Sequence, residues 1–522
     1  MAAVTLRNFS NRASTSDSWK AGLSGMAFNA ADKLDVYAYG LGDITSADIE
    51  VGRLNGCKPP TFVLSYKWPL ALDIVKRGFE AGRQKKLLSL FTEYFDQLGP
   101  TVELTILGGT GFATMDPENI EAVLSTHFDD FHLGPRNKAM MAMIGEGIFT
   151  QDGPAWKHSR ELLRRQFVRM QYQNLEGFRE HVENLVDAVN NSSGIVDLQP
   201  YFYRLTLNTT IAMILGQSVE SFNHEIGDLF SKAFNKASLI TATRVRLGDL
   251  YFLYAPKGFF AACKTVKEYT DQFVKDALQQ DRGNAEISDK YTFINNLQNE
   301  HQDVRLVRDQ VINVLIAGRD TTAATMSYVF RLLVRHPHVL KKLRGEIESV
   351  LGQDKDITRV YIQRMPYLQH VIKETLRLYP PVPINTRFCK QATTLPFGGG
   401  PDGRSPILVR EGMPVAYSVY HMHRRKDLYG SDAGTFRPER WEGSELADIK
   451  WAYLPFNGGP RLCLGKPEDF GLMLASYGIA RMIQAFPKIE LAPGEAWEEP
   501  GAERQHLTLT LSNADGCKVV LA

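Results

Sequence analysis

The chain has 522 residues, of which 44% are hydrophobic and 23% are charged. These proportions are those of an ordinary globular protein and exclude a disordered chain. Its 60 basic and 59 acidic residues leave a net charge of +1, so the overall charge gives no reason to expect nucleic acid as a partner. No run of residues approaches the roughly 20 consecutive apolar positions of a transmembrane helix, and we predict none.

The cysteines indicate a reducing, intracellular environment. Their number is odd, and they are widely scattered, without the spacing of a metal site or a disulfide framework. They are Cys57, Cys263, Cys389, Cys463 and Cys517. For the N-terminal stretch Met1 to Lys20, a disordered tail is the simpler interpretation and an organellar transit peptide is the alternative.

One large domain is predicted, because the chain has no internal repeat and no long linker. We divide it into a polar segment over residues 1–34, without a transmembrane helix, and a domain over residues 35–522. Apolar residues three and four apart predict helices over most of Glu118 to Gly352. Short strand-like runs lie at Thr101–Leu107, Ile407–Val409 and Leu507–Leu511, with a hairpin loop at Gly398–Gly403. The expected fold class is therefore mainly α with small β-sheets.

The glycine-rich segment Gly108 to Gly111 resembles a dinucleotide-binding turn only in part. The third small residue would be Thr114, and Asp116-Pro117 follows in place of a helix whose N-terminus packs on a pyrophosphate. We therefore exclude a nucleotide site there. The charged stretch Lys341 to Glu348 is similarly interpreted as the solvated face of a helix.

A long helix is predicted over Val304 to His336, closed by Pro337. Near its middle Asp320 stands beside Thr321. A threonine inside a helix can donate a hydrogen bond to the carbonyl four residues earlier, here Ala317. We expect Gly318 to leave room there for oxygen and water.

Glu374 and Arg377 stand three residues apart on a predicted helix, so their side chains share a face and can pair. Such pairs are common on protein surfaces. Further along the chain, the segment Phe436 to Trp441 contains Arg440, a second candidate partner for the carboxylate.

The loop from Phe456 to Gly465 is dense in glycine and precedes a helix that begins near Phe470. Glycines allow a flat macrocycle to approach the backbone, and N–H groups aimed at Cys463 favour a thiolate. Arg461 can pair with a carboxylate of such a ligand. The alternative is that Cys463 is a small buried apolar residue.

The pattern Phe-x-x-Gly-x-Arg-x-Cys-x-Gly over Phe456 to Gly465 resembles the haem-binding loop of the cytochrome P450 superfamily. Three further segments resemble the family in the same order along the chain: Trp156–Arg160, residues 317–322, and residues 373–377 with 436–441. The resemblance implies the cytochrome P450 fold, with a single large haem domain. It also implies haem b (iron protoporphyrin IX) as cofactor, with Cys463 as the axial ligand of the haem iron.

The resemblance carries further roles over to individual residues. Asp320 and Thr321 would deliver protons during oxygen activation. Glu374, Arg377 and Arg440 would form a buried network that fixes the loop before Cys463. The residues that would bind the cofactor are Trp156, Arg160, Arg387, Phe456, Arg461, Cys463 and Gly465.

Longer strings, including Leu395–Gly403 and Tyr417–Tyr420, resemble the fungal alkane and fatty-acid hydroxylases. That group implies an extended apolar substrate, oxidised at or near a chain end. Candidate pocket walls are Met140, Met141, Ile144, Val314, Ala317 and Ile384.

Two departures from that group limit the inference. Its members carry an N-terminal membrane helix, whereas this chain has the polar segment Met1 to Lys33. We therefore expect a cytoplasmic protein or peripheral contact with the endoplasmic reticulum membrane, or an anchor lost from the reading frame. With the stretch Lys466 to Asp469, the segment before Phe470 is about two residues longer than the usual pattern of the family. Pro467 suits the first turn of a helix, so the helix can start earlier than in that pattern.

The expected reaction is insertion of one oxygen atom of O2 into a C–H bond. No flavin or nicotinamide segment is evident, so a separate NADPH-dependent cytochrome P450 reductase is the predicted electron donor. Oxidative tailoring in a fungal secondary-metabolite pathway is an alternative. A haem-thiolate isomerase or dehydratase is another, although the Asp320-Thr321 pair argues against it. A haem protein that binds ligands without turnover is a third.

Overall fold

The computed structural model describes residues 44–170, 176–192, 194–215, 224–280, 293–294, 297–298, 303–352, 357–464 and 470–522. The predicted polar segment 1–34 and its boundary lie outside these residues, as do Gly465 and the stretch Lys466 to Asp469.

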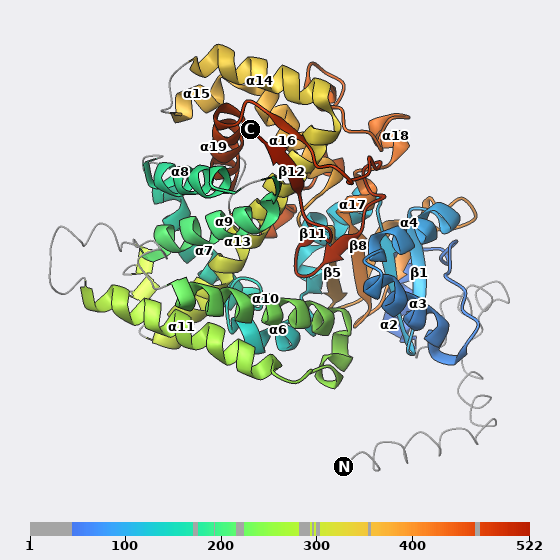
Figure 1. Cartoon of the computed structure of the whole chain (residues 1–522). Coiled ribbons are helices and arrows are strands. Elements are labelled where there is room, and N and C mark those ends of the chain that lie inside the picture. Colours follow the sequence, from blue (N-terminus) through green and yellow to red (C-terminus); the bar gives the residue numbers. More distant parts are fainter. Residues whose placement is uncertain are drawn as a thin grey trace, which may run out of the picture.

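Helices dominate the described chain, as predicted (Figure 1). The helices are α2 (Ser46–Leu54), α3 (Leu72–Arg83), α4 (Leu87–Leu98), α5 (Pro117–Glu121), α6 (Arg136–Ile144), α7 (Gly153–Met170), α8 (Glu176–Asn190), α9 (Leu198–Leu215), α10 (His224–Arg246), α11 (Phe259–Gln280), α13 (Val304–Arg335), α14 (Pro337–Leu351), α15 (Arg359–Gln363), α16 (Pro366–Leu378), α17 (Val419–Met422), α18 (Lys426–Tyr429) and α19 (Phe470–Ala485). None of the described helices combines the length and apolar character that a membrane span requires.

The strands form small sheets. They are β1 (Thr101–Ile106), β2 (Gly109–Thr114), β3 (Phe131–His132), β4 (Ile195–Asp197), β5 (Ile384–Cys389), β6 (Thr393–Gly399), β7 (Ser405–Val409), β8 (Pro414–Ser418), β9 (Ile489–Leu491), β10 (Gln505–Leu507), β11 (Leu511–Asn513) and β12 (Lys518–Leu521). The largest sheet has the order β1-β2-β8-β5-β3, in which β2 and β8 are parallel and the other pairs antiparallel. The remaining sheets have the orders β4-β12-β9, β6-β7 and β10-β11.

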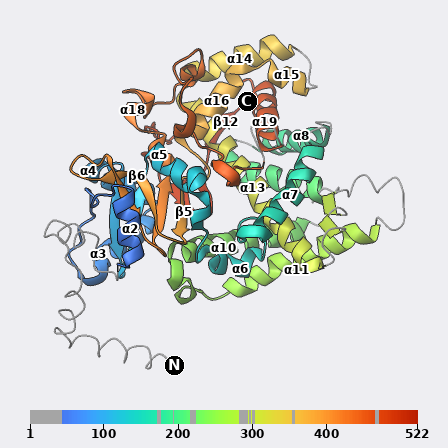
Figure 2. The ribbon, with the colours of Figure 1, turned by 180° about the vertical axis from the view of Figure 1, so that it is seen from behind.

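Helix α13 runs through the middle of the molecule, between the largest sheet with α2 to α4 on one side and most of the other helices on the other (Figures 1 and 2). It starts where Asp303 caps it by accepting a hydrogen bond from the Arg305 N–H. It ends at Arg335, with His336 as its C-cap, before Pro337 starts α14. Helices α9, α11, α16 and α19 pack against it, so most of its length is buried. This explains why its apolar pattern covers more than one face.

The predicted strand run Leu507–Leu511 is wrong in one respect. The structure has two strands there, and Leu507 pairs with Leu511 across a turn. Alternating apolar and polar residues continue through the turn, so period-2 patterning alone does not reveal it. The predicted hairpin loop at Gly398–Gly403 is confirmed as the connection between β6 and β7.

The segment Gly108 to Gly111 forms the hairpin between β1 and β2. A side chain at Gly111 would lie 2.5 Å from the Pro414 carbonyl oxygen, so the glycine allows β2 and β8 to pair closely. The structure therefore agrees that this is not a nucleotide-binding turn.

Candidate cofactor site

The loop that carries Cys463 is tightly folded and held to the protein behind it. The Cys463 N–H donates a hydrogen bond to the Phe456 carbonyl oxygen at 2.9 Å. Side chains at Gly458 and Gly459 would overlap the Trp451 ring and the Leu124 carbonyl group. These two glycines therefore allow the loop to lie close to its own supporting residues, a role that we did not predict.

Cys463 is exposed, whereas Cys263, Cys389 and Cys517 are buried and Cys57 is half-buried. Burial raises the pKa of the Cys389 and Cys517 thiols to about 12. A thiol in such surroundings is a poor ligand, because the thiolate is the form that binds metal. The exposure of Cys463 contradicts the alternative of a small buried apolar residue.

Three arginines from separate elements gather beside this loop. Arg136 from α6 and Arg387 from β5 both donate to the Asn385 side-chain oxygen, at 2.9 and 3.2 Å. Arg461 donates to Asp152 at 2.7 Å. Arg461 is the one member of this arginine cluster that forms an ion pair with another described residue.

The arginine cluster carries more positive than negative charge. Burial and, second to it, the charge of Arg387 together lower the pKa of Arg136 to about 10 and that of Arg461 to about 9. The Arg136 Nε atom is buried without a hydrogen-bond partner among the described residues. A buried donor left in this state is costly, and an anion with several carboxylate oxygens would satisfy it. The donor set therefore fits the two propionates of haem. We did not predict Arg136, which lies in no recognised motif.

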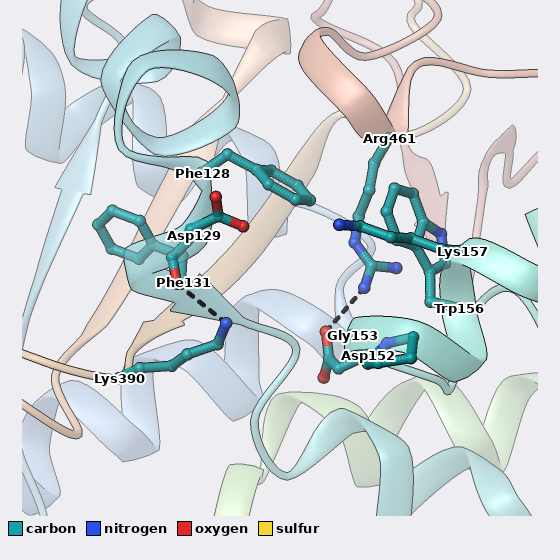
Figure 3. A pocket seen from close by; sticks show the side chains of 10 residues that line it. Phe128, Asp129, Phe131, Asp152, Gly153, Trp156, Lys157, Lys390 and Arg461 are labelled. Carbon is teal, nitrogen blue, oxygen red and sulfur yellow. Dashed lines mark hydrogen bonds and ion pairs between the residues drawn. The ribbon is translucent and has the colours of Figure 1, made fainter.

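Trp156 and Arg160 lie on α7, next to the arginine cluster. The Arg461 guanidinium is 4.3 Å from the centre of the Trp156 ring, and the Arg160 guanidinium is 5.8 Å from it. Burial lowers the pKa of Arg160, and the nearby charge of Cys463 partly reverses that effect. The structure thus brings Trp156, Arg160, Arg461 and Cys463 together. Figure 3 shows Trp156 and Arg461 at a small pocket, with Arg461 pointing towards Asp152.

The Asp-Thr step lies in the middle of α13. The Thr321 hydroxyl donates to the Ala317 carbonyl oxygen at 2.7 Å, as the sequence predicts. Asp320 accepts a hydrogen bond from Arg319 at 2.7 Å, and both side chains are buried. Burial raises the pKa of Asp320, and Arg319 opposes that rise. This partner of Asp320 was not predicted.

The expected role of Gly318 needs correction. A side chain at this position would place its Cβ 2.6 Å from the Thr210 hydroxyl on α9. The space beside Gly318 is therefore occupied by the neighbouring helix, and the glycine allows α9 and α13 to approach.

Glu374, Arg377 and Arg440 lie in one buried network. Glu374 accepts hydrogen bonds from Arg377 at 2.8 and 2.9 Å and from Arg440 at 2.8 Å. All three side chains are inaccessible to solvent. Arg377 also donates to the carbonyl oxygens of His423 and Ala433, each at 2.6 Å.

His423 links this network to the cysteine loop, and sequence reasoning missed it. Its Nδ1 lies 3.0 Å from the Arg377 carbonyl oxygen, and its Nε2 accepts a hydrogen bond from the Leu454 N–H at 2.9 Å. Burial lowers the pKa of His423 to about 3, so the ring is neutral and can accept that bond. Leu454 stands two residues before Phe456. No local motif reveals the role of His423, because it depends on contacts between segments that are far apart in the sequence.

The residues predicted to form the pocket walls do not all lie in one hydrophobic cluster. Met140, Ile144 and Val314 are buried in one hydrophobic cluster between α6 and α13. Ile384 packs against a different cluster. Met141 and Ala317 are half-buried.

Comparison with known proteins gives the same assignment as the site. The family model described as Cytochrome P450 matches residues 67–510. A "Cytochrome P450" of Arthroderma benhamiae is 44% identical over 90% of this chain and 93% of that protein. "Cytochrome P450 52A10" of Candida maltosa is 41% identical over 84% of this chain and 88% of its own. "Cytochrome P450 monooxygenase g430" of a Fusarium species is 38% identical over 88% of this chain and 84% of its own.

These matches cover the whole described site and agree with the mainly helical fold. Members of this family carry haem b and are monooxygenases that use O2, with electrons supplied from NADPH through a reductase. From the cysteine loop, the arginine cluster and these matches it follows that the chain belongs to the cytochrome P450 family of haem monooxygenases.

Proposed function

We propose that this monooxygenase hydroxylates extended apolar chains, alkanes or fatty acids, at or near a chain end. The observation that carries the proposal is the exposed Cys463 on its supported loop, beside Arg136 and Arg387, which form no ion pair with the described residues. The similarity to fungal and yeast relatives over more than four-fifths of the chain supports the substrate class.

In this proposal Cys463 would bind the haem iron, and Arg136, Arg387 and Arg461 would hold the haem propionates. Trp156 and Arg160 stand beside them as further contacts of the cofactor. When bound, haem supplies the activation of oxygen. The protein holds the cysteine, neutralises the propionates and keeps the apolar substrate away from water. Phe456 and Gly465 would complete the loop, although Gly465 lies outside the described residues.

Asp320 and Thr321 are proposed to deliver protons during oxygen activation. The Thr321 hydroxyl donates its proton to the Ala317 carbonyl oxygen, so the hydroxyl oxygen can accept a hydrogen bond from another group. The raised pKa of Asp320 favours exchange of its proton. Separation from Arg319 would be the step that frees this carboxylate.

The first test uses the purified protein with haem. The carbon monoxide complex of the reduced protein should give the spectrum of a thiolate-ligated haem, and Cys463→Ser should abolish that spectrum. The control Cys57→Ser changes a half-buried cysteine outside the site and should leave the spectrum unchanged. A protein that takes up no haem, or an unaltered spectrum in Cys463→Ser, would contradict the assignment.

The second test is turnover with hexadecane or hexadecanoic acid, using NADPH and a cytochrome P450 reductase as the proposed electron donor. Hydroxylated product should form with consumption of O2. Product formed without NADPH would indicate the isomerase or dehydratase alternative, and oxidation of polyketide-like compounds alone would indicate a tailoring enzyme.

We also propose peripheral contact with a lipid surface. Exposed apolar side chains occur on α3 with the segment before it, and on the connection from α10 to α11 with the first turn of α11. These segments lie on the same side of the molecule (Figures 1 and 2). They are Tyr66, Trp68, Leu70, Leu72, Phe79, Phe252, Leu253 and Phe260. Phe252→Ser with Leu253→Ser should reduce flotation with phosphatidylcholine vesicles; unchanged flotation would contradict the contact.

A further inference from the structure

Three basic residues from separate parts of the chain meet at the hairpin of β10 and β11. His506 is the middle residue of β10. On one side of it, the Gln505 N–H donates to the Lys85 carbonyl oxygen at 2.7 Å. On the other side, the guanidinium of Arg246, the last residue of α10, donates to the carbonyl oxygens of Leu507 and Thr508. Lys85, Arg246 and His506 therefore converge, and we name them the basic triad.

The charges that act on the basic triad are cationic. Burial lowers the pKa of Lys85, and the charges of Arg246 and Arg504 lower it further. Burial lowers the pKa of His506 to about 4, with further contributions from Lys85 and Arg246. The His506 Nε2 atom is buried without a hydrogen-bond partner among the described residues. An anion placed here would relieve the repulsion and satisfy this atom.

Arg504, on the same hairpin, differs from the basic triad because its charge is already balanced. It forms an ion pair with Asp515. The positive charge that no carboxylate balances is therefore that of Lys85 and Arg246. Arg504, whose charge is balanced, serves as the control for these two residues.

The hairpin leads from the basic triad to the apolar interior. Leu507 packs against one core cluster, and Leu509, at the turn, packs against the cluster that contains Ile144 and Val314. Strand β11 packs against α13. Figure 1 shows β11 close to the end of α10 that carries Arg246. The basic triad and apolar side chains that contact the core therefore lie along one hairpin.

We infer that the basic triad binds the carboxylate of a fatty acid whose hydrocarbon chain follows the hairpin towards α13. This inference rests on the proposed function and narrows it, since it predicts that free fatty acids bind more tightly than neutral chains of equal length. Lysine and arginine supply charged donors to the carboxylate, and His506 supplies a further contact through Nε2. The same chemistry would suit the phosphate of a membrane lipid, so the test must separate the two sources.

The experiment measures binding to the full-length holoenzyme by the change in the haem spectrum. The two ligands are dodecanoic acid and methyl dodecanoate, which differ in charge and share the apolar chain. Arg246→Gln and Lys85→Gln should each weaken the binding of the acid about tenfold, as expected for loss of one charge-assisted contact. Binding of the ester should change less than about twofold. The control is the double variant Arg504→Gln with Asp515→Asn, which removes a balanced pair and should leave both affinities unchanged.

Equal affinity of acid and ester in the unmodified protein would overturn the inference, as would parallel weakening of both ligands in Arg246→Gln. In a second arm, the same variants are tested for binding to phosphatidylcholine vesicles with and without phosphatidylglycerol. If the variants lose the preference for anionic vesicles but bind dodecanoic acid as before, the basic triad binds lipid head groups. That result would also overturn the inference of a fatty-acid site. If neither ligand perturbs the haem, the proposed function fails first, and this inference fails with it.

Discussion

Glu374 is a fully buried carboxylate whose oxygens are all engaged. Besides Arg377 and Arg440, it accepts hydrogen bonds from the Trp441 ring N–H at 3.0 Å and the Arg437 backbone N–H at 3.1 Å. Burial raises the pKa of Glu374, but the two arginines and these donors outweigh that effect and leave the pKa lowered. Glu374 is therefore negatively charged in the folded protein, and its partners there stabilise that charge.

Replacing Glu374 by Gln should destabilise the protein by about 3 to 5 kcal/mol, because two buried arginines would lose their counter-charge. The free energy of unfolding in urea measures the effect, and haem content reports whether the cysteine loop is disturbed through His423. A lowered pKa in the folded state means that the stabilisation is present above the ordinary value of 4.5 and is lost as pH falls through the folded-state pKa. The difference in unfolding free energy between the unmodified protein and Glu374→Gln should therefore become smaller at acid pH.

A suitable control is Glu348→Gln on α14, an exposed position. Its unfolding free energy should change by less than about 0.5 kcal/mol. Equal stability of Glu374→Gln and the unmodified protein at neutral pH would show that the network is dispensable.

At the scale of elements, the contact of α9 with α13 fixes where Asp320 and Thr321 lie. Thr206 on α9 donates to the Arg319 carbonyl oxygen at 2.8 Å, and Thr210 fills the space beside Gly318. The guanidinium of Arg319 lies 4.9 Å from the ring centre of Tyr203, also on α9. The two helices therefore position the Asp-Thr step through small residues and hydroxyl groups.

Gly318→Ala should destabilise the protein by about 1 to 3 kcal/mol, since the added methyl group would meet Thr210 at less than normal contact distance. Thermal unfolding of the holoprotein measures the change. Adding Thr210→Ala should recover most of the loss. The matched control is Gly345→Ala on α14, where nothing lies within 4 Å of the new methyl group. That change should stabilise the helix by about 0.5 to 1 kcal/mol, so a similar response of both glycines would refute the close contact.

Sequence patterns predicted elements best where they act locally. The limits of α13 follow from Asp303 and Pro337, which set helix ends through their own chemistry. The function of Gly318 could not be predicted, because it depends on a residue more than 100 positions away. The turn within Leu507–Leu511 was missed for a related reason, since its strands are defined by pairing with each other.

At the scale of the whole molecule, the arginine cluster joins α6, β5 and the cysteine loop, which are far apart in the sequence. Cations held together in this way weaken the fold until an anion offsets them. Because haem binds the folded protein, its binding energy adds to the stability of the whole structure.

Removal of haem should accordingly lower the midpoint of thermal unfolding. Arg136→Gln should speed haem loss about tenfold, measured by transfer of haem to apomyoglobin, because it removes one charged donor. The exposed Arg404 on the β6–β7 connection provides the control, and Arg404→Gln should leave the rate unchanged. An unaltered rate in Arg136→Gln would remove that residue from the cofactor site.

Much of the site could be predicted from motifs, and the reason is physical. Cys463, Glu374 and Thr321 belong to short motifs whose residue types and spacing can be recognised along the chain. Arg136 and His423 act across elements, through Asn385 and Leu454, and no spacing along the chain encodes such contacts.

The sheet β4-β12-β9 has a consequence for biosynthesis. Strand β12 supplies the central strand, and the Leu198 N–H at the start of α9 donates to the Cys517 carbonyl oxygen. During translation, the segment that leads into α9 must therefore wait until β12 has been synthesised before these hydrogen bonds can form. A nascent chain that stops before β12 would leave β4 and β9 without the strand that joins them.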